Sequence, residues 1–172
     1  MQKIVLVGYM GSGKTTIGKK MADKTGIPFY DLDEIIEQKT GKTISELFSE
    51  QGEICFRKLE HEIFNDFIKN QDNFILALGG GTPCYANNHL LLQQEDIASF
   101  YLKASIQELS KRLRREKKHR PLIAKLDDGE LEEFIAKHLF DRSYFYHFAK
   151  NVISVDGKNP SELVSEIIEK LA

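Results

Sequence analysis

Residues 8–15 read G-Y-M-G-S-G-K-T, and they carry the strongest structural signal in this chain. It matches the pattern G-x-x-x-x-G-K-[ST], in which a glycine-rich loop wraps around the phosphates of a nucleotide. An apolar run, Lys3–Val7, precedes it, and a helical pattern follows it from Lys14. A turn that only joined a strand to a helix would not need all these features in this context, so we interpret the stretch as a phosphate loop.

The residue types of this loop suit a triphosphate. Glycines let the backbone fold tightly with its N–H groups pointing inward, and the N-terminus of the following helix adds partial positive charge. Lys14 is expected to reach the β- and γ-phosphates, and the Thr15 hydroxyl is expected to take a place on Mg²⁺. A second G-K-T at residues 41–43 lacks both the first glycine and a preceding strand, so we assign it no function.

Short apolar runs alternate with helical patterns along the rest of the chain. Runs that are apolar throughout are typical of strands covered on both faces, as in a parallel sheet. The pattern predicts one domain, residues 1–172, with a three-layer α/β fold, right-handed crossovers and ligands at the C-terminal strand ends. The predicted strands are Lys3–Val7, Pro28–Tyr30, Phe74–Leu78, Ser99–Leu102 and Val152–Val155.

Helix start and stop signals lie between these runs. Gly26 can end a helix predicted from Lys14 to Lys24, and Asn159-Pro160 opens the last helix. Two pairs have the spacing of a capping box, in which a side chain and the backbone at a helix start exchange hydrogen bonds. These pairs are Thr43 with Glu46 and Ser105 with Glu108.

A long amphipathic helix is predicted between Ile54 and Ile68. Its apolar residues recur at helical spacing, so we expect them to form one buried stripe. Arg57 lies within this pattern. The stripe consists of Ile54, Phe56, Leu59, Ile63, Phe67 and Ile68.

Composition excludes several classes of protein. The net charge is −2, which gives no electrostatic reason to expect binding to nucleic acid or to an anionic membrane. The two cysteines, Cys55 and Cys84, have neither metal-ligand spacing nor the density of a disulfide scaffold. No secretory signal or bilayer-spanning stretch is visible, so we expect a cytoplasmic protein with reduced thiols.

A phosphate loop predicts a bound nucleotide but does not by itself predict a kinase. Molecular switches and motor ATPases share the loop. The chain has no N-K-x-D motif for reading guanine, and 172 residues are few for a motor. What remains is chiefly the group of small kinases built on this loop.

Carboxylates and glycines follow two of the predicted strands. Asp31 and Asp33 are two residues apart, so on an extended segment both would point toward the phosphates, one near Mg²⁺ and one near an acceptor hydroxyl. Asp33 could equally be an acidic residue at a helix start. Gly79–Gly81 follow another strand, where glycine permits a ligand to approach the backbone closely.

Basic residues gather between Arg112 and Arg120, just before Pro121. Such a cluster can be an RNA-binding patch, a solvated helix face or a lid over phosphates. The overall negative charge argues against the first of these. Arg142, further along, lies four residues before Tyr146.

In the order and spacing of these motifs the chain resembles the shikimate kinase family along essentially its whole length. That family uses ATP and Mg²⁺ to phosphorylate the 3-hydroxyl of shikimate, on the route to chorismate and the aromatic amino acids. The resemblance implies a five-stranded parallel sheet, a helical acceptor-binding insertion at about 33–60 and a lid at about 112–125. The motifs that carry it are residues 8–16, D-x-D-x-x-I-E from Asp31, G-E-x-x-F-R-x-x-E from Gly52, Gly79–Gly81, Arg120-Pro121-Leu122, Arg142-x-x-x-Tyr146 and Asn159-Pro160.

The resemblance also implies roles for individual residues. Lys14, Asp33 and Arg120 would be catalytic, with Asp33 holding the acceptor hydroxyl and Arg120 reaching the transferring phosphate from the lid. Thr15 and Asp31 would lie at the Mg²⁺. The acceptor site would comprise Asp33, Arg57, Gly80, Gly81 and Arg142, with the two arginines on the carboxylate. The nucleotide site would comprise Gly11, Ser12, Gly13, Lys14, Thr15, Thr16, Arg112, Arg120 and Pro160, with Arg112 and Pro160 flanking the adenine.

Three alternatives stay open at this point. The acceptor could be another small hydroxy compound, such as gluconate, which also carries a carboxylate. A regulatory protein could keep the fold and bind nucleotide without catalysis, although Lys14, Asp33 and both arginines are present. Within the lid, Arg114 or Arg115 could replace Arg112 beside the adenine.

We expect a monomer, because no heptad pattern or long apolar edge indicates a partner.

Overall fold

Five parallel strands form a single sheet in the computed structural model, which describes residues 1–172. The order across the sheet is β2-β3-β1-β4-β5. The predicted strand positions are confirmed to within two residues at each end. The strands are β1 (Lys3–Val7), β2 (Phe29–Asp31), β3 (Phe74–Ala77), β4 (Ile97–Lys103) and β5 (Asn151–Ser154).

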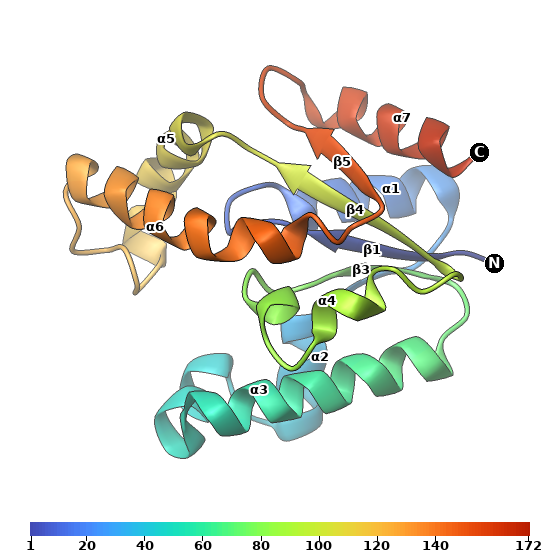
Figure 1. Ribbon diagram of the computed structural model, residues 1–172, viewed down its shortest axis with the longest axis horizontal. Helices are drawn as coiled ribbons and strands as arrows, with labels where there is room; N and C mark the ends of the chain where they lie inside the picture. The colour runs from blue at the N-terminus through green and yellow to red at the C-terminus, as the bar shows by residue number, and fades with distance from the viewer.

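Helices cover both faces of this sheet, so the predicted three-layer α/β fold is confirmed (Figure 1). Helices α1 and α7 pack against each other, and α5 packs against α6. None of the helices is long and apolar enough to cross a membrane. The α-helices are α1 (Lys14–Thr25), α2 (Leu32–Thr40), α3 (Ile44–Asn70), α4 (Asn88–Leu91), α5 (Ile106–Glu116), α6 (Asp128–Tyr146) and α7 (Pro160–Leu171), and short 3₁₀ turns are η1 (Thr82–Cys84) and η2 (Lys117–His119).

The expected caps start the helices. Thr43 and Glu46 form a complete capping box at the start of α3, and Asn159 forms one with Glu162 at the start of α7. The side chain of Ser105 accepts a hydrogen bond from the backbone N–H of Glu108 at 3.1 Å, so it caps α5, but the Glu108 carboxylate pairs with Arg112 and no complete capping box forms. Each cap satisfies backbone groups that a helix start leaves without partners, which is why these boundaries could be predicted locally.

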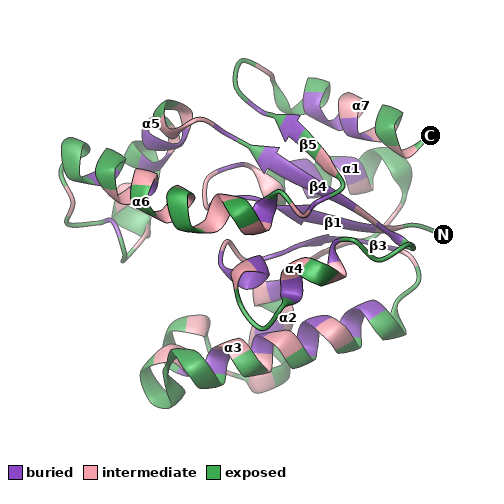
Figure 2. Ribbon diagram, viewed as in Figure 1, coloured by how far each residue is buried: buried purple, intermediate pink, exposed green.

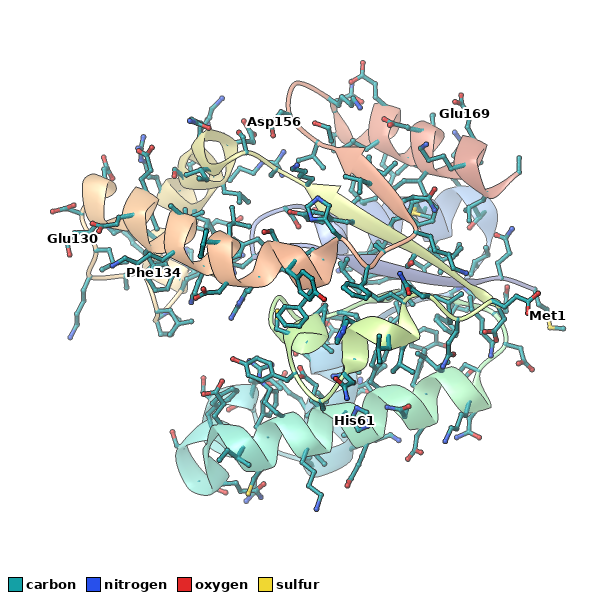
Figure 3. All side chains as sticks on the ribbon, viewed as in Figure 1. Met1, His61, Glu130, Phe134, Asp156 and Glu169 are labelled. Atoms are coloured by element: carbon teal, nitrogen blue, oxygen red, sulfur yellow. The ribbon has the colours of Figure 1, made fainter.

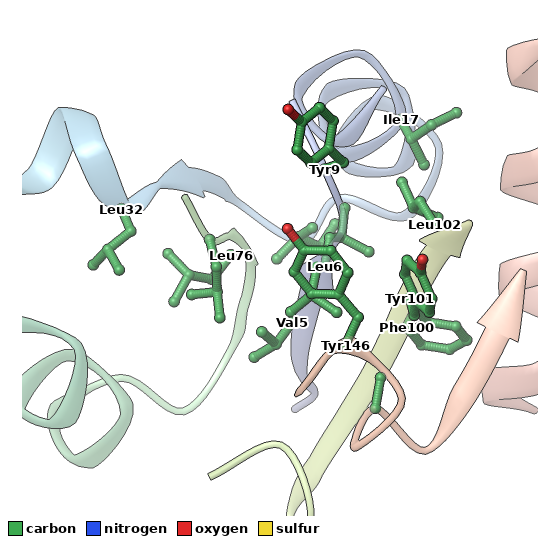
Figure 4. Close-up of a cluster of buried hydrophobic side chains, with 14 of the residues drawn as sticks. Val5, Leu6, Tyr9, Ile17, Leu32, Leu76, Phe100, Tyr101, Leu102 and Tyr146 are labelled. Atoms are coloured by element: carbon green, nitrogen blue, oxygen red, sulfur yellow. The ribbon is translucent and has the colours of Figure 1, made fainter. Parts of the chain in front are cut away.

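The core lies between the sheet and its helices. Strands β1, β3 and β4 are buried on both faces, as Figure 2 shows by the purple ribbon along them. Val5 and Leu6 of β1 lie in one cluster with Leu76, Phe100 and other apolar side chains (Figure 4). This burial explains why the strands are mostly apolar and do not alternate between apolar and polar residues.

The predicted stripe along the long helix is wrong at one position. Ile54 is 89% exposed, whereas Phe56, Ile63 and Phe67 are buried. Two residues along a helix correspond to a rotation of about 200°, so Ile54 and Phe56 cannot share a face. The helix also begins earlier than predicted, and Gly52 (φ 82°) interrupts it with a kink.

The strand order brings the loops of interest together. Strand β1 lies between β3 and β4, and all strands are parallel. The loops after β1 and β3 therefore leave the same edge of the sheet side by side. Ligands of open parallel sheets bind at this edge, where the chain crosses over to opposite faces.

Close packing of α1 on β2 generates a stability prediction. A methyl group on Gly18 would lie 2.2 Å from the ring of Phe29. The overlap should outweigh the gain of roughly 1 kcal/mol that alanine brings to a helix interior, because overpacking typically costs about 1–3 kcal/mol. We expect Gly18→Ala to lower the free energy of unfolding by about 1–2 kcal/mol, measured by urea denaturation.

Gly129→Ala is the matched control. A methyl group there would meet only Asp127 Oδ1 at 3.6 Å, an ordinary contact, near the start of α6. This variant should be neutral or slightly stabilising. Equal stability changes in the two variants would contradict the close approach of α1 to β2.

Candidate active site

A cavity of about 580 Å³ lies at the C-terminal edge of the sheet. It is bordered by the loop after β1, the start of α2, the loop after β3, the end of α5 and the start of α7. The sequence-predicted residues that line it are Gly11, Ser12, Gly13, Lys14, Thr15, Thr16, Asp31, Asp33, Gly80, Arg112, Arg120 and Pro160. The predicted Arg57, Gly81 and Arg142 are outside this lining and lie around the glycine loop after β3.

The phosphate loop turns where its glycines allow it. Gly11 and Gly13 have φ values of 83° and 101°, which side chains of other residues rarely tolerate. Gly13 is the N-cap of α1, and no side chain caps this helix. The N–H groups of the first turn are therefore available to an anion, and the helix dipole adds to the attraction.

Lys14 is held close to this loop. Its Nζ donates hydrogen bonds to the carbonyl oxygens of Gly8 at 2.6 Å and Tyr9 at 3.1 Å. Burial lowers the pKa of Lys14 to about 8, although the carboxylates of Asp33 and Asp31 counteract the effect. A phosphate group in the cavity would favour the charged ammonium, because it supplies the opposite charge that the site needs.

The geometry of the two aspartates differs from the prediction of an extended segment and agrees with the alternative of an acidic helix start. Asp31 ends β2 and caps α2, since its Oδ1 accepts from the backbone N–H of Asp33 at 2.9 Å and of Glu34 at 3.4 Å. Asp33 stands in the first turn of that helix. Both residues nevertheless line the same cavity. The start of a helix therefore places them at the predicted site, although an extended strand was expected to do so.

The folded structure disfavours the ionised form of Asp33. Burial raises its pKa to about 6, and the neighbouring carboxylates of Asp31 and Glu60 raise it further, while Lys14 opposes them. A methyl group on Gly79 would lie 3.2 Å from Asp33 Oδ1, so the glycine leaves room for this carboxylate. Such a group is suited to accept or orient a proton near neutral pH.

Each glycine of the loop after β3 faces one charged side chain. Gly79 faces Asp33, and a methyl group on Gly80 would lie 3.3 Å from an Arg142 nitrogen. On Gly81, a methyl group would lie 2.6 Å from Arg57 Nη2. The glycines thus let a carboxylate and two guanidinium groups approach one short segment of backbone.

Arg57 is fixed by a buried carboxylate and by aromatic rings. Its Nη1 donates to Glu60 at 3.0 Å, and Glu60, only 1% exposed, also accepts from the Thr82 hydroxyl at 2.8 Å. The guanidinium carbon lies 4.2 Å from the ring centre of Tyr85. Stacking and ion pairing together leave this arginine little freedom.

A polar network supports Thr82 from behind. The buried Asn88 donates from Nδ2 to the carbonyl oxygen of Thr82 at 3.0 Å. Its Oδ1 lies 2.6 Å from Nδ1 of His61, which is labelled on α3 in Figure 3. The loop after β3 is therefore tied to α3 through satisfied hydrogen bonds, which favour one geometry.

Arg142 differs from Arg57 because no carboxylate of the protein pairs with it. It lies on α6, half-buried, with the ring centre of Tyr9 5.9 Å from its guanidinium carbon. One turn later on α6, the hydroxyl of Tyr146 donates to the carbonyl oxygen of Gly80 at 2.6 Å. An unpaired, partly desolvated guanidinium is suited to bind an external anion.

The basic cluster divides into residues that reach the cavity and residues that do not. Arg112 donates to the Gly11 carbonyl oxygen at 3.1 Å, and Arg115 also lines the cavity. Arg114 is outside the lining and lies 3.5 Å from Asp128. Arg120 lines the cavity and donates twice to Glu116, at 2.9 and 2.7 Å.

Several residues of the site were not singled out as functional from the sequence. Glu116 and Lys158 line the cavity, and Lys158 pairs with Glu166 at 2.8 Å. Tyr85 stacks on Arg57 from a loop whose next residues, Ala86 and Asn87, have positive φ values. No pattern of spacing marks these residues, whereas Glu60 at i+3 from Arg57 on a helix was a readable signal.

Comparisons with known proteins agree with this geometry. The family model described as shikimate kinase matches residues 10–172. A shikimate kinase of Flavobacterium johnsoniae is 55% identical over 172 residues, which is the whole of both chains. The solved shikimate kinase of Bacteroides thetaiotaomicron has a TM-score of 0.91 at 36% identity, covering 99% of this chain and 98% of its own. A shikimate kinase of Acinetobacter baumannii, solved in complex with shikimate, has a TM-score of 0.86 at 31% identity, covering 99% and 93%.

The raised pKa of Asp33 generates a prediction about stability. Ionisation is less favourable in the folded chain than in the unfolded one, so stability should fall as pH rises from 3.8 to about 6 and then stay level. The full difference corresponds to about 3 kcal/mol, and solvent around this half-buried group reduces the expected effect to about 1–2 kcal/mol. We expect Asp33→Asn to raise Tm at pH 7.5 by roughly 2–8 °C.

The pH dependence makes this test specific. The increase in Tm of Asp33→Asn over wild type should be smaller at pH 4.5, where the carboxyl of folded wild type is largely protonated. Glu34→Gln, an exposed change in the same helix turn, is the matched control and should shift Tm little at either pH. A lower Tm for Asp33→Asn at pH 7.5 would show that its carboxylate is stabilising.

Proposed function

The chain belongs to the shikimate kinase family, and on that premise we propose how its residues transfer the γ-phosphoryl group of ATP to the 3-hydroxyl of shikimate, giving shikimate 3-phosphate and ADP. The observation that carries the proposal is the glycine loop after β3, which faces Asp33, Arg142 and Arg57 beside the phosphate-loop cavity. Two guanidinium groups and one carboxylate suit an acceptor that has both a carboxylate and a hydroxyl.

The nucleotide end of the site uses backbone groups and cations. The uncapped first turn of α1 binds the phosphates with the N–H groups of residues 14–16, and Lys14 turns from the loop carbonyls to the β- and γ-phosphates. Arg112 and Pro160 flank the adenine; Arg112 is preferred to Arg114 because Arg114 lies outside the cavity. Arg115 remains close enough to assist.

Residues present in the cavity also fit Mg²⁺. No group of three metal-binding side chains exists, which suits an ion held mainly by water and nucleotide phosphates. Thr15 and Asp31 line the same cavity and would supply the oxygen atoms from the protein. The capping bonds of Asp31 use Oδ1, so Oδ2 is available. When bound, the ion neutralises charge that develops on the phosphate oxygens.

The acceptor end has a net positive charge at its carboxylate subsite. Glu60 neutralises Arg57, while Arg142 has no carboxylate of the protein as its partner. The shikimate carboxylate therefore completes a charge pair with Arg142 and adds a bidentate contact to Arg57, against the backbone of Gly80 and Gly81. This arrangement fixes the acceptor by its carboxylate and leaves its 3-hydroxyl toward Asp33.

Transfer then depends on placement and charge. Asp33 accepts a hydrogen bond from the 3-hydroxyl and takes its proton as the bond to phosphorus forms and the bond to ADP breaks. Lys14 and Arg120 stabilise the charge on the transferring group. Arg120 must leave Glu116 to do so, which suits a lid at about 112–125 that closes over bound substrates.

The site is assembled within one chain, so a monomer suffices for this reaction. The acceptor-binding insertion at about 33–60 supplies Asp33 and Arg57, and the remaining groups come from the rest of the same domain. A cytoplasmic location is part of the proposal, since the reaction consumes ATP. Nucleic acid and membranes have no role in it.

The first experiment is ADP release from Mg·ATP by the purified protein with shikimate, gluconate, nucleoside monophosphates or no acceptor. We expect release to depend on shikimate, with one phosphate appearing on the acid. A preference for gluconate would reassign the acceptor. Release independent of any acceptor, or no release, would leave the arginines and glycine loop without the proposed role.

Replacing Arg142 should separate acceptor binding from nucleotide binding. A charge-assisted hydrogen bond is worth about 1.5–3 kcal/mol, so we expect Arg142→Ala to raise the KM for shikimate roughly 10- to 100-fold. The KM for ATP should change less than about threefold. Arg114→Ala is the control, because Arg114 is outside the cavity and should change neither constant. A change in the KM for ATP alone would contradict the role of Arg142 in acceptor binding and assign it to the nucleotide site.

A further inference from the structure

Tyr9 joins the phosphate loop to a distant helix. It is the second residue of the loop and only 1% exposed, and Figure 4 shows its ring beside the first turns of α1. Its hydroxyl lies 2.8 Å from Nδ1 of His138 on α6, 129 residues away in the sequence. Neither side chain has a role in the mechanism above, and no motif marks His138.

On the loop side, Tyr9 is connected to the phosphate-binding groups through its backbone. Its carbonyl oxygen accepts from Lys14 Nζ at 3.1 Å and from the backbone N–H of Ser12 at 3.1 Å. These bonds hold the backbone of Tyr9 within the loop, so the loop gives its ring a fixed position. The position of its ring is linked to the nucleotide end of the site.

On the helix side, His138 precedes Arg142 by one turn of α6. The ring of His138 also packs on Phe134, another turn earlier and labelled in Figure 3, with ring centres 4.3 Å apart. Tyr9 thus contacts α6 twice, through its hydroxyl at His138 and through its ring face, 5.9 Å from the guanidinium of Arg142. These contacts connect α6 to the loop next to the acceptor arginine.

The protonation states suit a neutral hydrogen bond. Burial raises the pKa of Tyr9 to about 12, so the phenol keeps its proton. Burial also lowers the pKa of His138, with Arg142 acting in the same direction and Asp141 opposing it. At neutral pH the hydrogen bond therefore joins a protonated phenol to an uncharged imidazole, which adds no positive charge beside Arg142.

We propose that Tyr9 and His138 are a positioning pair that holds Arg142 at a fixed place relative to the phosphate loop. The proposal rests on the proposed function, because it matters only if Arg142 binds the acceptor carboxylate. Phosphoryl transfer requires the acceptor hydroxyl and the γ-phosphate in line at a set separation, and small displacements reduce the rate strongly. The pair supplies one rigid connection between the two ends of the site.

A purely structural role predicts different behaviour. If the hydrogen bond only satisfied a buried tyrosine, its loss would lower stability and leave the properties of the folded enzyme unchanged. A positioning role predicts a change specific to the acceptor. The KM for shikimate and the KM for ATP distinguish the two roles.

The test uses steady-state kinetics of the full chain with four variants and a control. Tyr9→Phe keeps the ring over Arg142 and removes only the hydroxyl, while His138→Leu removes the partner. Either change should raise the KM for shikimate about 3- to 10-fold, the range expected for one net hydrogen bond, with the KM for ATP within twofold of wild type. His138→Asn, which places a polar atom near the position of Nδ1, should restore the wild-type value within twofold.

The fourth variant combines Tyr9→Phe with His138→Leu. Its KM for shikimate should be no higher than that of the more affected single variant, because the two substitutions remove the same hydrogen bond. Tyr30→Phe, a similar change on β2 at a ring that packs on Phe67, is the control and should leave both constants unchanged. Tm values and ADP dissociation constants verify that each variant is folded.

Outcomes separate this inference from the proposed function. If the wild-type protein shows no shikimate-dependent turnover, the proposed function fails and the pair has no acceptor to position. If wild type is active but the single variants change the two KM values equally or not at all, the positioning role alone is overturned. Multiplicative effects in the double variant, or no recovery with His138→Asn, would overturn it as well.

Discussion

The structure depends on one constraint, that a multiply charged anion must be bound by backbone N–H groups at the end of a buried strand. This requires a loop with left-handed glycines at positions 11 and 13, a helix start without a side-chain cap, and an ammonium held in a desolvated place. Strand β1 is therefore central in the sheet and apolar from Ile4 to Val7, because it must hold the loop rigidly. The positions of the neighbouring strands follow from the need to cover it.

The proposed acceptor site lies next to this loop because of the strand order. Strand β3 pairs directly with β1 in parallel register, so its glycine loop emerges beside the phosphate loop. Its supporting groups come from both directions along the chain, with Arg57 from α3 and Arg142 from α6. The two arginines have different surroundings, since a buried glutamate and stacked rings fix Arg57, whereas no carboxylate of the protein pairs with Arg142. Placement of this kind suits phosphoryl transfer, which needs little covalent assistance from the protein.

The charges of the site oppose the stability of the fold. Burial shifts the pKa of Lys14 down and that of Asp33 up, so the folded chain disfavours the charged form of both groups. Their mutual attraction offsets the cost only in part. Such shifts are typical of functional sites, where substrate charges complete an arrangement that the protein alone leaves unbalanced. Most of the remaining core is apolar, so the stability of the fold does not require these buried charges.

The sequence alone was enough to predict the fold class, the phosphate loop, the strands and most helix boundaries, because glycine spacing, apolar runs and caps act over a few residues. It also supplied most of the residues around the cavity, partly through resemblance to a family. The helix start at Asp31 and the exposure of Ile54 agree with local spacing, whereas only the packing of the whole chain brings Arg112 to the loop and leaves Arg114 outside the cavity. The contact of Tyr9 with His138 spans 129 residues, and no local pattern encodes it. Which side chains meet across such distances depends on how the helices pack on the sheet, and that packing is a property of the whole chain.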